Sequence, residues 1–462
     1  MLRLLLLAPP ALLLPLVVLA VVLLLVLRSD PRHGPAPYEQ ERVSAAWLSS
    51  ATLLVGAAGC GTSGGLEGLR MAGGAAPSSP AEYARAAAAA VRLGELVPGH
   101  RGRVFCASPA PGGAPAFATA CEDCALRVWA PCAAAGGAWR VAAAKPKAHA
   151  EEVLRCSFRA LADPGALLDA SEAPVVASGG ADGTVRLWSI GPPAPTAPEG
   201  APLRLEQRAV HELSEQCYVA DFDTEVDDSG ALYCASDDVL VCMDAESGAR
   251  RYEFRCASAS AASEAYGGDR NTEGAALIFG SSLSPQGASQ RLLALALSDG
   301  SVRLHARKGG AAVGAVACGG GAHVTACALG GAAGELLAVG CGDGTAEVFD
   351  VRYLDAPLSS LRAHHRPVYA LAWLSPQGTA GDVLLTASSD ASVKFWGVGE
   401  PGDGNDASQP LAVVTREAYP FMAACVVGNG GAKGNGDGSL VLAGGSEAPL
   451  GMMPIYVSPL GC

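Results

Sequence analysis

The chain contains 462 residues and is apolar and glycine-rich, with 58 Gly, 31 Pro and 17% charged residues. This composition excludes a charge-driven disordered chain, and at about 150 residues per domain the length allows one large repeat domain or several ordinary ones. The formal net charge of −13 argues against a phosphate-binding surface, so we expect no nucleic-acid partner.

The N-terminal segment from Leu4 to Leu27 contains no charged residue. At about 1.5 Å per residue, a helix of this length spans a hydrocarbon core of about 30 Å. Residues 1–27 are therefore predicted to form a transmembrane anchor. A cleaved signal segment is the alternative, although the apolar run is longer than the usual signal core and no Ala-x-Ala site precedes Arg28.

The residues around this segment give no orientation, because Arg3 lies on one side and Arg28 and Arg32 on the other. The chain has 15 cysteines, and this odd number is unlike a fully paired extracellular disulfide framework. We therefore expect a single-pass membrane protein whose folded part faces the cytoplasm, with the lumen of the secretory pathway as the alternative.

Residues 28–42 form a polar, proline-bearing linker, and residues 43–462 are predicted to form one folded domain. Within this domain, residues 43–71 fit three strands of a degenerate first unit. Residues 76–97 begin with Ser-Pro-Ala-Glu and continue in an alanine run, which favours a helix.

A hairpin pattern recurs after this segment. The stretch ASGGADGTVRLWSI, residues 177–190, contains an Asp-Gly pair suited to a two-residue turn, followed by an alternating strand that ends in Trp. An Asp followed six residues later by Trp occurs three times, and weaker copies keep the spacing after Asp237, Asp299 and Asp343 with another end residue. Recurrence of one hairpin predicts a repeat architecture.

The three strong copies share two further positions. A Ser or Thr lies four residues before the Asp, and a His lies four residues before the Val that opens the preceding strand. We call each set of four a tetrad. The tetrads are His100, Thr119, Asp123 and Trp129; His149, Ser178, Asp182 and Trp188; and His364, Thr386, Asp390 and Trp396.

These units resemble the WD-repeat family, whose repeats form the four-stranded blades of a β-propeller. The resemblance covers roughly residues 43 to 460 and implies an all-β fold, a single closed propeller of seven or eight blades. It also implies that each tetrad forms a buried hydrogen-bonded chain within a blade. The Trp-Asp pair of the family is absent from the strong copies, where Ala130, Ser189 and Gly397 follow the Trp.

The resemblance further implies an outer strand near residues 76–97, so that this region remains open between helix and strand. After Trp396, the stretches PLAVVTREAY, FMAACVV, SLVLAGG and MMPIYVS fit four strands. Pairing of N-terminal with C-terminal strands would close the ring and leave no sheet edge unpaired. Loop insertions are expected at 191–203, 257–273 and 399–409.

The sequence offers little for catalysis or metal binding. It contains no Walker loop and no H-E-x-x-H. Cys121 and Cys124 form a lone C-x-x-C, without the second pair or histidine cluster that would complete a zinc site. We therefore expect no cofactor, no metal, no small-molecule substrate and no enzymatic activity.

The function that we expect is a non-catalytic scaffold for protein partners, tethered to a membrane through Leu4 to Leu27. The resemblance implies that partners bind the face that carries the turn aspartates; ordinary solvated loop residues are the alternative there. The candidate contacts are Arg101, Arg103, Glu122, Glu152, His365 and Pro367.

Two other functions stay open. The stretch FDVR, Phe349 to Arg352, resembles the Asp-x-Arg box of propellers that serve as substrate receptors of ubiquitin ligases. A propeller enzyme would instead carry convergent polar residues in the central channel, and the sequence names none.

Overall fold

The computed structural model describes one part of the chain in detail. The chain divides into two compact units, Met1–Leu66 and Glu67–Cys462, and the described residues belong to the second. The predicted anchor Leu4 to Leu27, the linker 28–42 and the strands predicted within 43–71 lie outside them. The described residues are 79–93, 95–110, 114–132, 138–159, 175–191, 203–257, 275–318, 322–331, 334–374, 382–398, 409–415, 421–428, 438–444 and 453–459.

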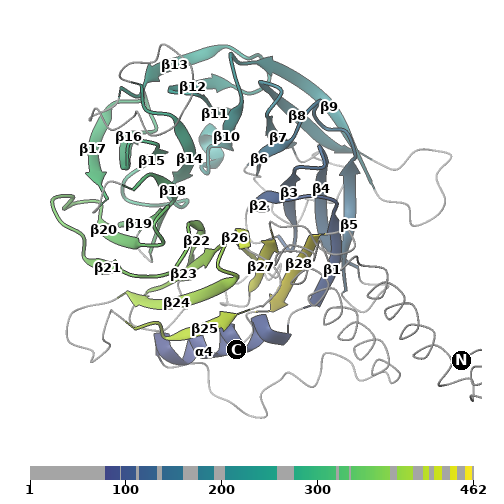
Figure 1. The fold of residues 1–462 in the computed structure, drawn as a ribbon. Coiled ribbons are helices and arrows are strands. Elements are labelled where there is room, and N and C mark those ends of the chain that lie inside the picture. The colour runs from purple at the N-terminus through teal and green to yellow at the C-terminus, as the bar shows by residue number, and fades with distance from the viewer. Residues whose placement is uncertain are drawn as a thin grey trace, which may run out of the picture. The chain divides into compact units, whose positions relative to one another are not determined.

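Four-stranded antiparallel sheets make up the β-structure of this region (Figure 1). The first three sheets along the chain are β2 (Val104–Pro109), β3 (Phe117–Cys121), β4 (Leu126–Cys132) and β5 (Ala138–Lys145); β6 (Val153–Phe158), β7 (Val175–Gly180), β8 (Thr184–Gly191) and β9 (Leu203–Glu212); and β10 (Cys217–Phe222), β11 (Ala231–Ser236), β12 (Val239–Asp244) and β13 (Arg250–Arg255). Two parallel residue pairs between β5 and β9 join the first two of these sheets at their outer edges.

Three more sheets follow in the same up-and-down order. They are β14 (Ile278–Leu283), β15 (Leu292–Leu297), β16 (Ser301–Ala306) and β17 (Ala312–Ala317); β18 (Val324–Gly330), β19 (Leu336–Cys341), β20 (Ala346–Asp350) and β21 (Ser359–Leu361); and β22 (Val368–Leu374), β23 (Asp382–Ser388), β24 (Ser392–Val398) and β25 (Ala412–Thr415).

The last sheet combines strands from both ends of the described region. β26 (Phe421–Gly428), β27 (Gly438–Gly444) and β28 (Met453–Pro459) pair in order, and β1 (Glu95–His100) completes the sheet as its outer strand. In this pairing Leu96 lies opposite Tyr456. Residues more than 350 positions apart thus share one sheet, and the described strands form seven such sheets rather than eight.

The first strand of each sheet faces the centre of the arrangement. These inner strands contact one another in the order β2, β6, β10, β14, β18, β22 and β26, and β26 in turn contacts β2. Figure 1 shows the sheets following one another in a circle. The expectation of an all-β fold built from four-stranded blades is confirmed for the described residues.

The region 76–97, for which either a helix or a strand was expected, contains one of each. Helix α4 spans Pro80–Leu93 and is followed directly by strand β1. Ser79 caps the helix by accepting a hydrogen bond from the backbone N–H of Glu82 at 3.3 Å. Tyr83 and Ala84 are buried against the sheet of β22–β25, so the helix covers that outer edge.

None of the described helices is long and apolar enough to cross a bilayer. The predicted anchor at Leu4 to Leu27 is not among the residues searched.

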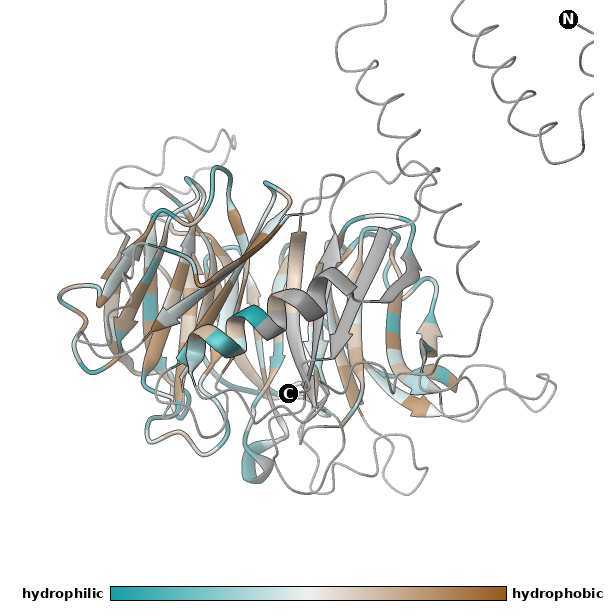
Figure 2. Ribbon diagram, turned by 90° about the horizontal axis from the view of Figure 1, so that it is seen from below, coloured by the Kyte–Doolittle hydropathy of each residue, from teal (hydrophilic) through white to brown (hydrophobic). Residues whose placement is uncertain are grey.

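Burial separates the strands by their place in each sheet. β3 and β7 are buried at every residue, because neighbouring sheets cover both of their faces. The outer strand β9 buries one residue in ten, Leu205. In the edge-on view of Figure 2 the hydrophobic residues concentrate in the strands and the hydrophilic ones in the connecting turns.

Candidate functional site

The tetrad of the sheet β6–β9 is a continuous chain of hydrogen bonds. His149 Nδ1 lies 2.9 Å from Asp182 Oδ1, and His149 Nε2 lies 2.7 Å from Ser178 Oγ. Trp188 donates from Nε1 to the same hydroxyl at 2.8 Å. His149, Ser178 and Trp188 are buried, so each polar atom of the chain has a protein partner where water is excluded.

The other two tetrads have the same geometry. His100 lies 3.0 Å from Asp123 Oδ1 and 2.6 Å from Thr119 Oγ1, and Trp129 donates to that hydroxyl at 2.9 Å. In the sheet β22–β25 the corresponding distances are 3.0, 2.8 and 3.0 Å, among His364, Asp390, Thr386 and Trp396. The structure therefore brings together the members of all three sets.

Burial and hydrogen bonding determine the protonation states of His149 and Asp182. Burial lowers the pKa of His149 by more than the hydrogen bond to Asp182 raises it, so the ring is neutral at pH 7. Burial alone would raise the pKa of Asp182, but hydrogen bonds from the Ala150 backbone, Thr184 and His149 outweigh it and hold that pKa at about 2. A neutral ring that donates from Nδ1 to the carboxylate must accept from the Ser178 hydroxyl at Nε2.

A basic residue four positions after the turn aspartate strengthens two of the tetrads, and our sequence interpretation missed it. Arg127 donates to Asp123 at 2.9 Å, and Arg186 donates to Asp182 at 3.0 Å. Arg303 has the same spacing from Asp299. A search for a cation at this fixed spacing would have found these positions.

The weaker copies fold without a tetrad. Asp343 accepts hydrogen bonds from the backbone and hydroxyl of Thr345 within its own turn, at 2.9 and 2.6 Å. At the end position of another copy, His305 stacks on Phe254 with ring centroids 4.1 Å apart and bonds the carbonyl of Gly310. The turn aspartate is therefore the shared element, and the histidine chain is added in three sheets.

The residues around the C-x-x-C motif do not fit a metal ion. His100, Cys121 and Asp123 place their ligand atoms within 4.8 Å of one another. However, Arg127 contacts both His100 Nδ1 and the Asp123 carboxylate, and burial raises the pKa of the Cys121 thiol. A cation in the site and a protonated thiol both oppose metal binding, and the imidazole and carboxylate already bind each other.

The inner strands surround a central cavity of about 1040 Å³. A β-bulge interrupts the pairing of every one of the seven inner strands with its neighbour, always around the second residue of the strand. A bulge redirects the side chain that it leaves unpaired, and bulges are common beside functional sites. These residues line the cavity: Phe105, Leu154, Tyr218, Phe279, Thr325, Tyr369 and Met422.

Six of these seven side chains are large and apolar, and all six are half-buried. Because β2, β6 and β22 each begin four residues after a tetrad histidine, this apolar ring lies at the end of the cavity nearest the tetrads. We call it the mouth ring. Tyr218 and Phe279 meet edge to face, with centroids 6.3 Å apart, as do Phe279 and His323.

Polar groups deeper in the cavity are paired with each other. Arg155 donates two hydrogen bonds of 2.9 Å to Asp221 on the next sheet, and a third of 3.2 Å to the carbonyl of Ser281 on the sheet after that. The two charges therefore neutralise one another and link three neighbouring inner strands.

The six candidate contact residues all lie beside the tetrads. The backbone N–H groups of Arg101 and His365 donate to Asp123 and Asp390, and both side chains are exposed. Glu152 and Pro367 are half-exposed. Arg103 is exposed and Glu122 is half-exposed, and their side chains form two hydrogen bonds of 3.1 Å with each other.

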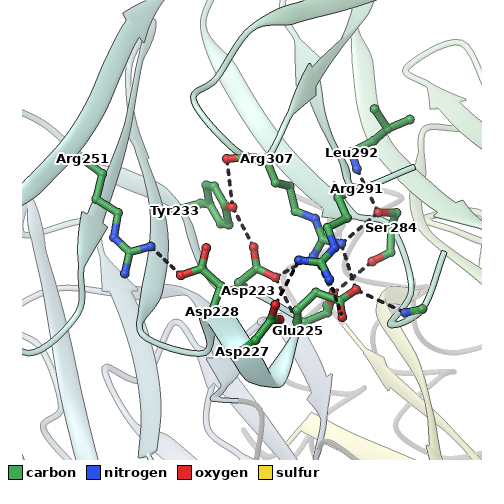
Figure 3. A network of polar contacts seen from close by, with 12 residues as sticks. Asp223, Glu225, Asp227, Asp228, Tyr233, Arg251, Ser284, Arg291, Leu292 and Arg307 are labelled. Atoms are coloured by element: carbon green, nitrogen blue, oxygen red, sulfur yellow. Dashed lines mark hydrogen bonds and ion pairs between the residues drawn. The ribbon is translucent and has the colours of Figure 1, made fainter. Parts of the chain in front are cut away.

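A buried ion network links the sheets β10–β13 and β14–β17, and nothing in the sequence pattern indicated it (Figure 3). Arg307 donates to Asp223 at 2.7 Å and lies 3.4 Å from Glu225, and its side chain is 2% exposed. Tyr233 donates to the other oxygen of Asp223 at 2.8 Å. Arg291 extends the network to the surface, 3.6 Å from Glu225.

Arg352 of the Asp-x-Arg stretch is bound within its own sheet. Its guanidinium lies 2.6 Å from Asp350 and 2.8 Å from Glu335, and its side chain is 48% exposed. Tyr353 and Leu358, which follow it in the chain, are 71% and 60% exposed.

Two segments of the chain match the family described as WD domain, G-beta repeat, at residues 147–189 and 355–397. Each segment contains one complete tetrad, and the tetrad that begins at His100 lies outside both. Together with the repeated hydrogen-bond chain, these matches identify the chain as a WD40-repeat protein.

A stretch of 71 residues is 39% identical to the COMPASS component SWD1 of Saccharomyces cerevisiae. It covers 15% of this chain and 16% of the yeast protein, so the likeness is distant and partial.

Proposed function

We propose that this protein is a non-catalytic scaffold, a single closed propeller that binds protein partners at the end of its cavity nearest the tetrads. The observation that carries the proposal is the mouth ring. Seven bulges at one position of seven inner strands turn six large apolar side chains toward the cavity, where they stay half exposed. Half-exposed apolar side chains of this size are the anchors that protein interfaces use.

The tetrads support this role by making the face rigid. Asp123, Asp182 and Asp390 accept hydrogen bonds from the backbone that follows each tetrad histidine, at Arg101, Ala150 and His365. The loops entering β2, β6 and β22 are thereby fixed before a partner arrives. A pre-organised surface loses little entropy on binding.

A cross-linking experiment tests the site. A photoreactive amino acid is introduced at Arg101, beside the mouth ring, and in a second variant at Val210, which is 40% exposed on the outer strand β9. We expect the full-length protein in cells to cross-link to discrete partners from position 101 and not from position 210. Equal or stronger cross-linking from position 210 would move the binding site to the outer strands.

The membrane tether stays a prediction from the sequence of Leu4 to Leu27, with the folded unit on the cytoplasmic side. Extraction of membranes with alkaline carbonate tests it. The full-length protein should stay with the lipid, and a variant lacking residues 1–35 should not. Release of the full-length protein, or a mature N-terminus after residue 28, would contradict the anchor.

The second candidate function is a substrate receptor of a ubiquitin ligase, favoured by the exposed Tyr353 and Leu358 next to Arg352. A partner docked there would cover two apolar side chains that are now in water. A Tyr353→Ser, Leu358→Ser double variant should then lose a ligase core from purified complexes while it keeps the partners cross-linked at position 101. Unchanged ligase content would exclude this surface.

A further inference from the structure

Two cysteines face each other where the first two sheets meet. Cys106 lies on the inner strand β2 and Cys156 on the inner strand β6, and these two strands contact one another. Both side chains belong to one buried cluster, and the Cys106 thiol donates to the backbone carbonyl of Cys156, with 3.5 Å between Sγ and O. The two residues are 50 positions apart, so only the tertiary structure brings them together.

The register of the two strands explains why the thiols meet. Cys156 pairs with Ser178 of its tetrad. In β2 the residue that pairs with the tetrad Thr119 is Ala107, so Cys106 lies one position earlier in the repeat than Cys156 does. Successive side chains of a strand point to opposite faces. Cys106 therefore points from β2 toward the second sheet, and Cys156 points from β6 back toward the first.

The surroundings of the pair favour oxidation. Both cysteines line the central cavity of about 1040 Å³, which has room for water-sized molecules, and Cys106 is the more exposed of the two, 6% against 1%. The hydrogen bond from the Cys156 thiol lowers the pKa of Cys106 more than burial raises it, and the charge of Arg155 lowers that pKa further. Asp221 opposes this shift less than Arg155 favours it. The thiolate is the form of cysteine that attacks an oxidant.

We infer that Cys106 and Cys156 are a redox modification site, at which hydrogen peroxide forms a reversible disulfide between the first two sheets at the cavity wall. This site goes beyond the proposed scaffold function and does not depend on partner binding at the mouth ring.

The reaction has two steps. The Cys106 thiolate attacks one oxygen of the peroxide, the O–O bond breaks, and a sulfenic acid forms while the leaving hydroxide takes up a proton to become water. The Cys156 sulfur then loses its proton and attacks the Cys106 sulfur, and the S–O bond breaks as the S–S bond forms and the second water leaves. Two thiols and one peroxide thus give one disulfide and two waters. A dithiol reductant reverses the change by thiol–disulfide exchange.

Other thiols of the chain lack part of this arrangement. Cys327 lines the cavity and is half-buried, but burial raises its pKa to about 12. Cys318 and Cys341 share a buried cluster between the sheets β14–β17 and β18–β21, and there the negative charges of Asp343 and Glu347 oppose ionisation of Cys341. Oxidation is therefore expected first at the pair that lies beside the cation.

Peptide mapping of the purified full-length protein tests the inference. The reduced protein is treated with hydrogen peroxide at about pH 7, the remaining thiols are blocked with N-ethylmaleimide, and a non-reducing digest is analysed by mass spectrometry. We expect a peptide pair joined through Cys106 and Cys156 to form at least about tenfold faster than Cys327 is oxidised, and to disappear with dithiothreitol. Absence of this peptide pair, or earlier oxidation of Cys327 or of Cys318 with Cys341, overturns the inference.

Variants test the order of the two steps. Cys156→Ser removes the second thiol, so Cys106 should stop at the sulfenic acid and be labelled by dimedone. Cys106→Ser removes the attacking thiolate and should leave Cys156 reduced at the same peroxide dose. Cys327→Ser is the matched control and should form the disulfide at the parent rate. Labelling of Cys156 in the Cys106→Ser variant as fast as the parent reacts overturns the inference, provided that the thermal midpoints match.

Discussion

The sheets β6–β9 and β14–β17 are stabilised by different kinds of polar contact. In the first, His149, Ser178, Asp182 and Trp188 form a polar chain inside one blade. In the second, the end position is His305, no tetrad forms, and Arg307 just after it pairs with acidic residues that follow β10 on the neighbouring sheet. The polar contacts of the first sheet lie within that sheet, and those of the second connect it to the neighbouring sheet.

This difference shows that the repeat unit is not uniform in what stabilises it. A tetrad makes a blade rigid through a neutral histidine and one ionised aspartate, both hydrogen-bonded within the blade, whereas the Arg307 network joins two blades through several buried charges. Burying charges is costly, so removal of one member leaves the others uncompensated. Mutations in the two regions should therefore differ in how much they lower the free energy of unfolding. They should also differ in whether they weaken contacts within one sheet or between two sheets.

The largest effect is expected for Arg307→Ala. This change leaves the carboxylate of Asp223 buried without its cation and Glu225 with Arg291 alone, at an expected cost of about 3–5 kcal/mol in the free energy of unfolding. Denaturant titration of the purified protein measures it. Arg250→Ala, at an exposed pair with Glu253, is the matched control and should cost less than about 1 kcal/mol. Similar losses in both variants would contradict a special role for the buried network.

Asp182→Ala should have the next largest effect. It removes the acceptor of His149, Thr184, Arg186 and the Ala150 backbone, so we expect a loss of about 2–3 kcal/mol. Asp343→Ala is the control, because that exposed aspartate bonds Thr345 within its own turn and should cost about 1 kcal/mol. Equal losses would mean that the histidine chain adds nothing to the turn.

Acidification should cause a smaller, graded loss of stability. Burial lowers the pKa of His100, His149 and His364 below the ordinary value of 6.5 in the folded state, so protonation favours the unfolded chain. The contribution of the neutral histidines to the free energy of unfolding is complete above about pH 6.5. It is lost as the pH falls through their lower folded-state pKa values. Thermal melts from about pH 7.5 to pH 5 measure the decline. His149→Gln should show a shallower one, and an unchanged slope would exclude His149 as a contributor.

The smallest effect on stability is expected at the exposed pair of Arg103 and Glu122. Their side chains are 46% and 36% exposed, so a double-mutant cycle should give a coupling energy below about 1 kcal/mol. The double variant Arg101→Ala, Arg103→Ala should accordingly melt near the parent temperature and still lose partners in pull-downs. Unchanged partners would place the contacts elsewhere on the face, and a lost fold would show that these arginines support the loop.

The tetrads could be predicted from sequence because their members occur at fixed short spacings. Six residues separate Asp182 from Trp188 in a hairpin whose turn places Gly183 at φ 71°, and the same turn forms with Cys124 at 60° and Ala391 at 61°. Such spacing is set by local strand and turn geometry. The Arg307 network could not be predicted, because its partners lie 82 to 84 residues away and are ordinary charged residues in the sequence.

The sequence by itself determined the repeated hairpins and the residues of the three tetrads, since both follow from local geometry. Only the tertiary structure decided that helix α4 precedes β1, that the terminal strands that pair with each other are β1 and β28, and that seven bulges turn a ring of apolar side chains to one mouth. These features depend on contacts between segments far apart in the chain, where the gain in free energy comes from burying surface and closing sheet edges rather than from any local motif.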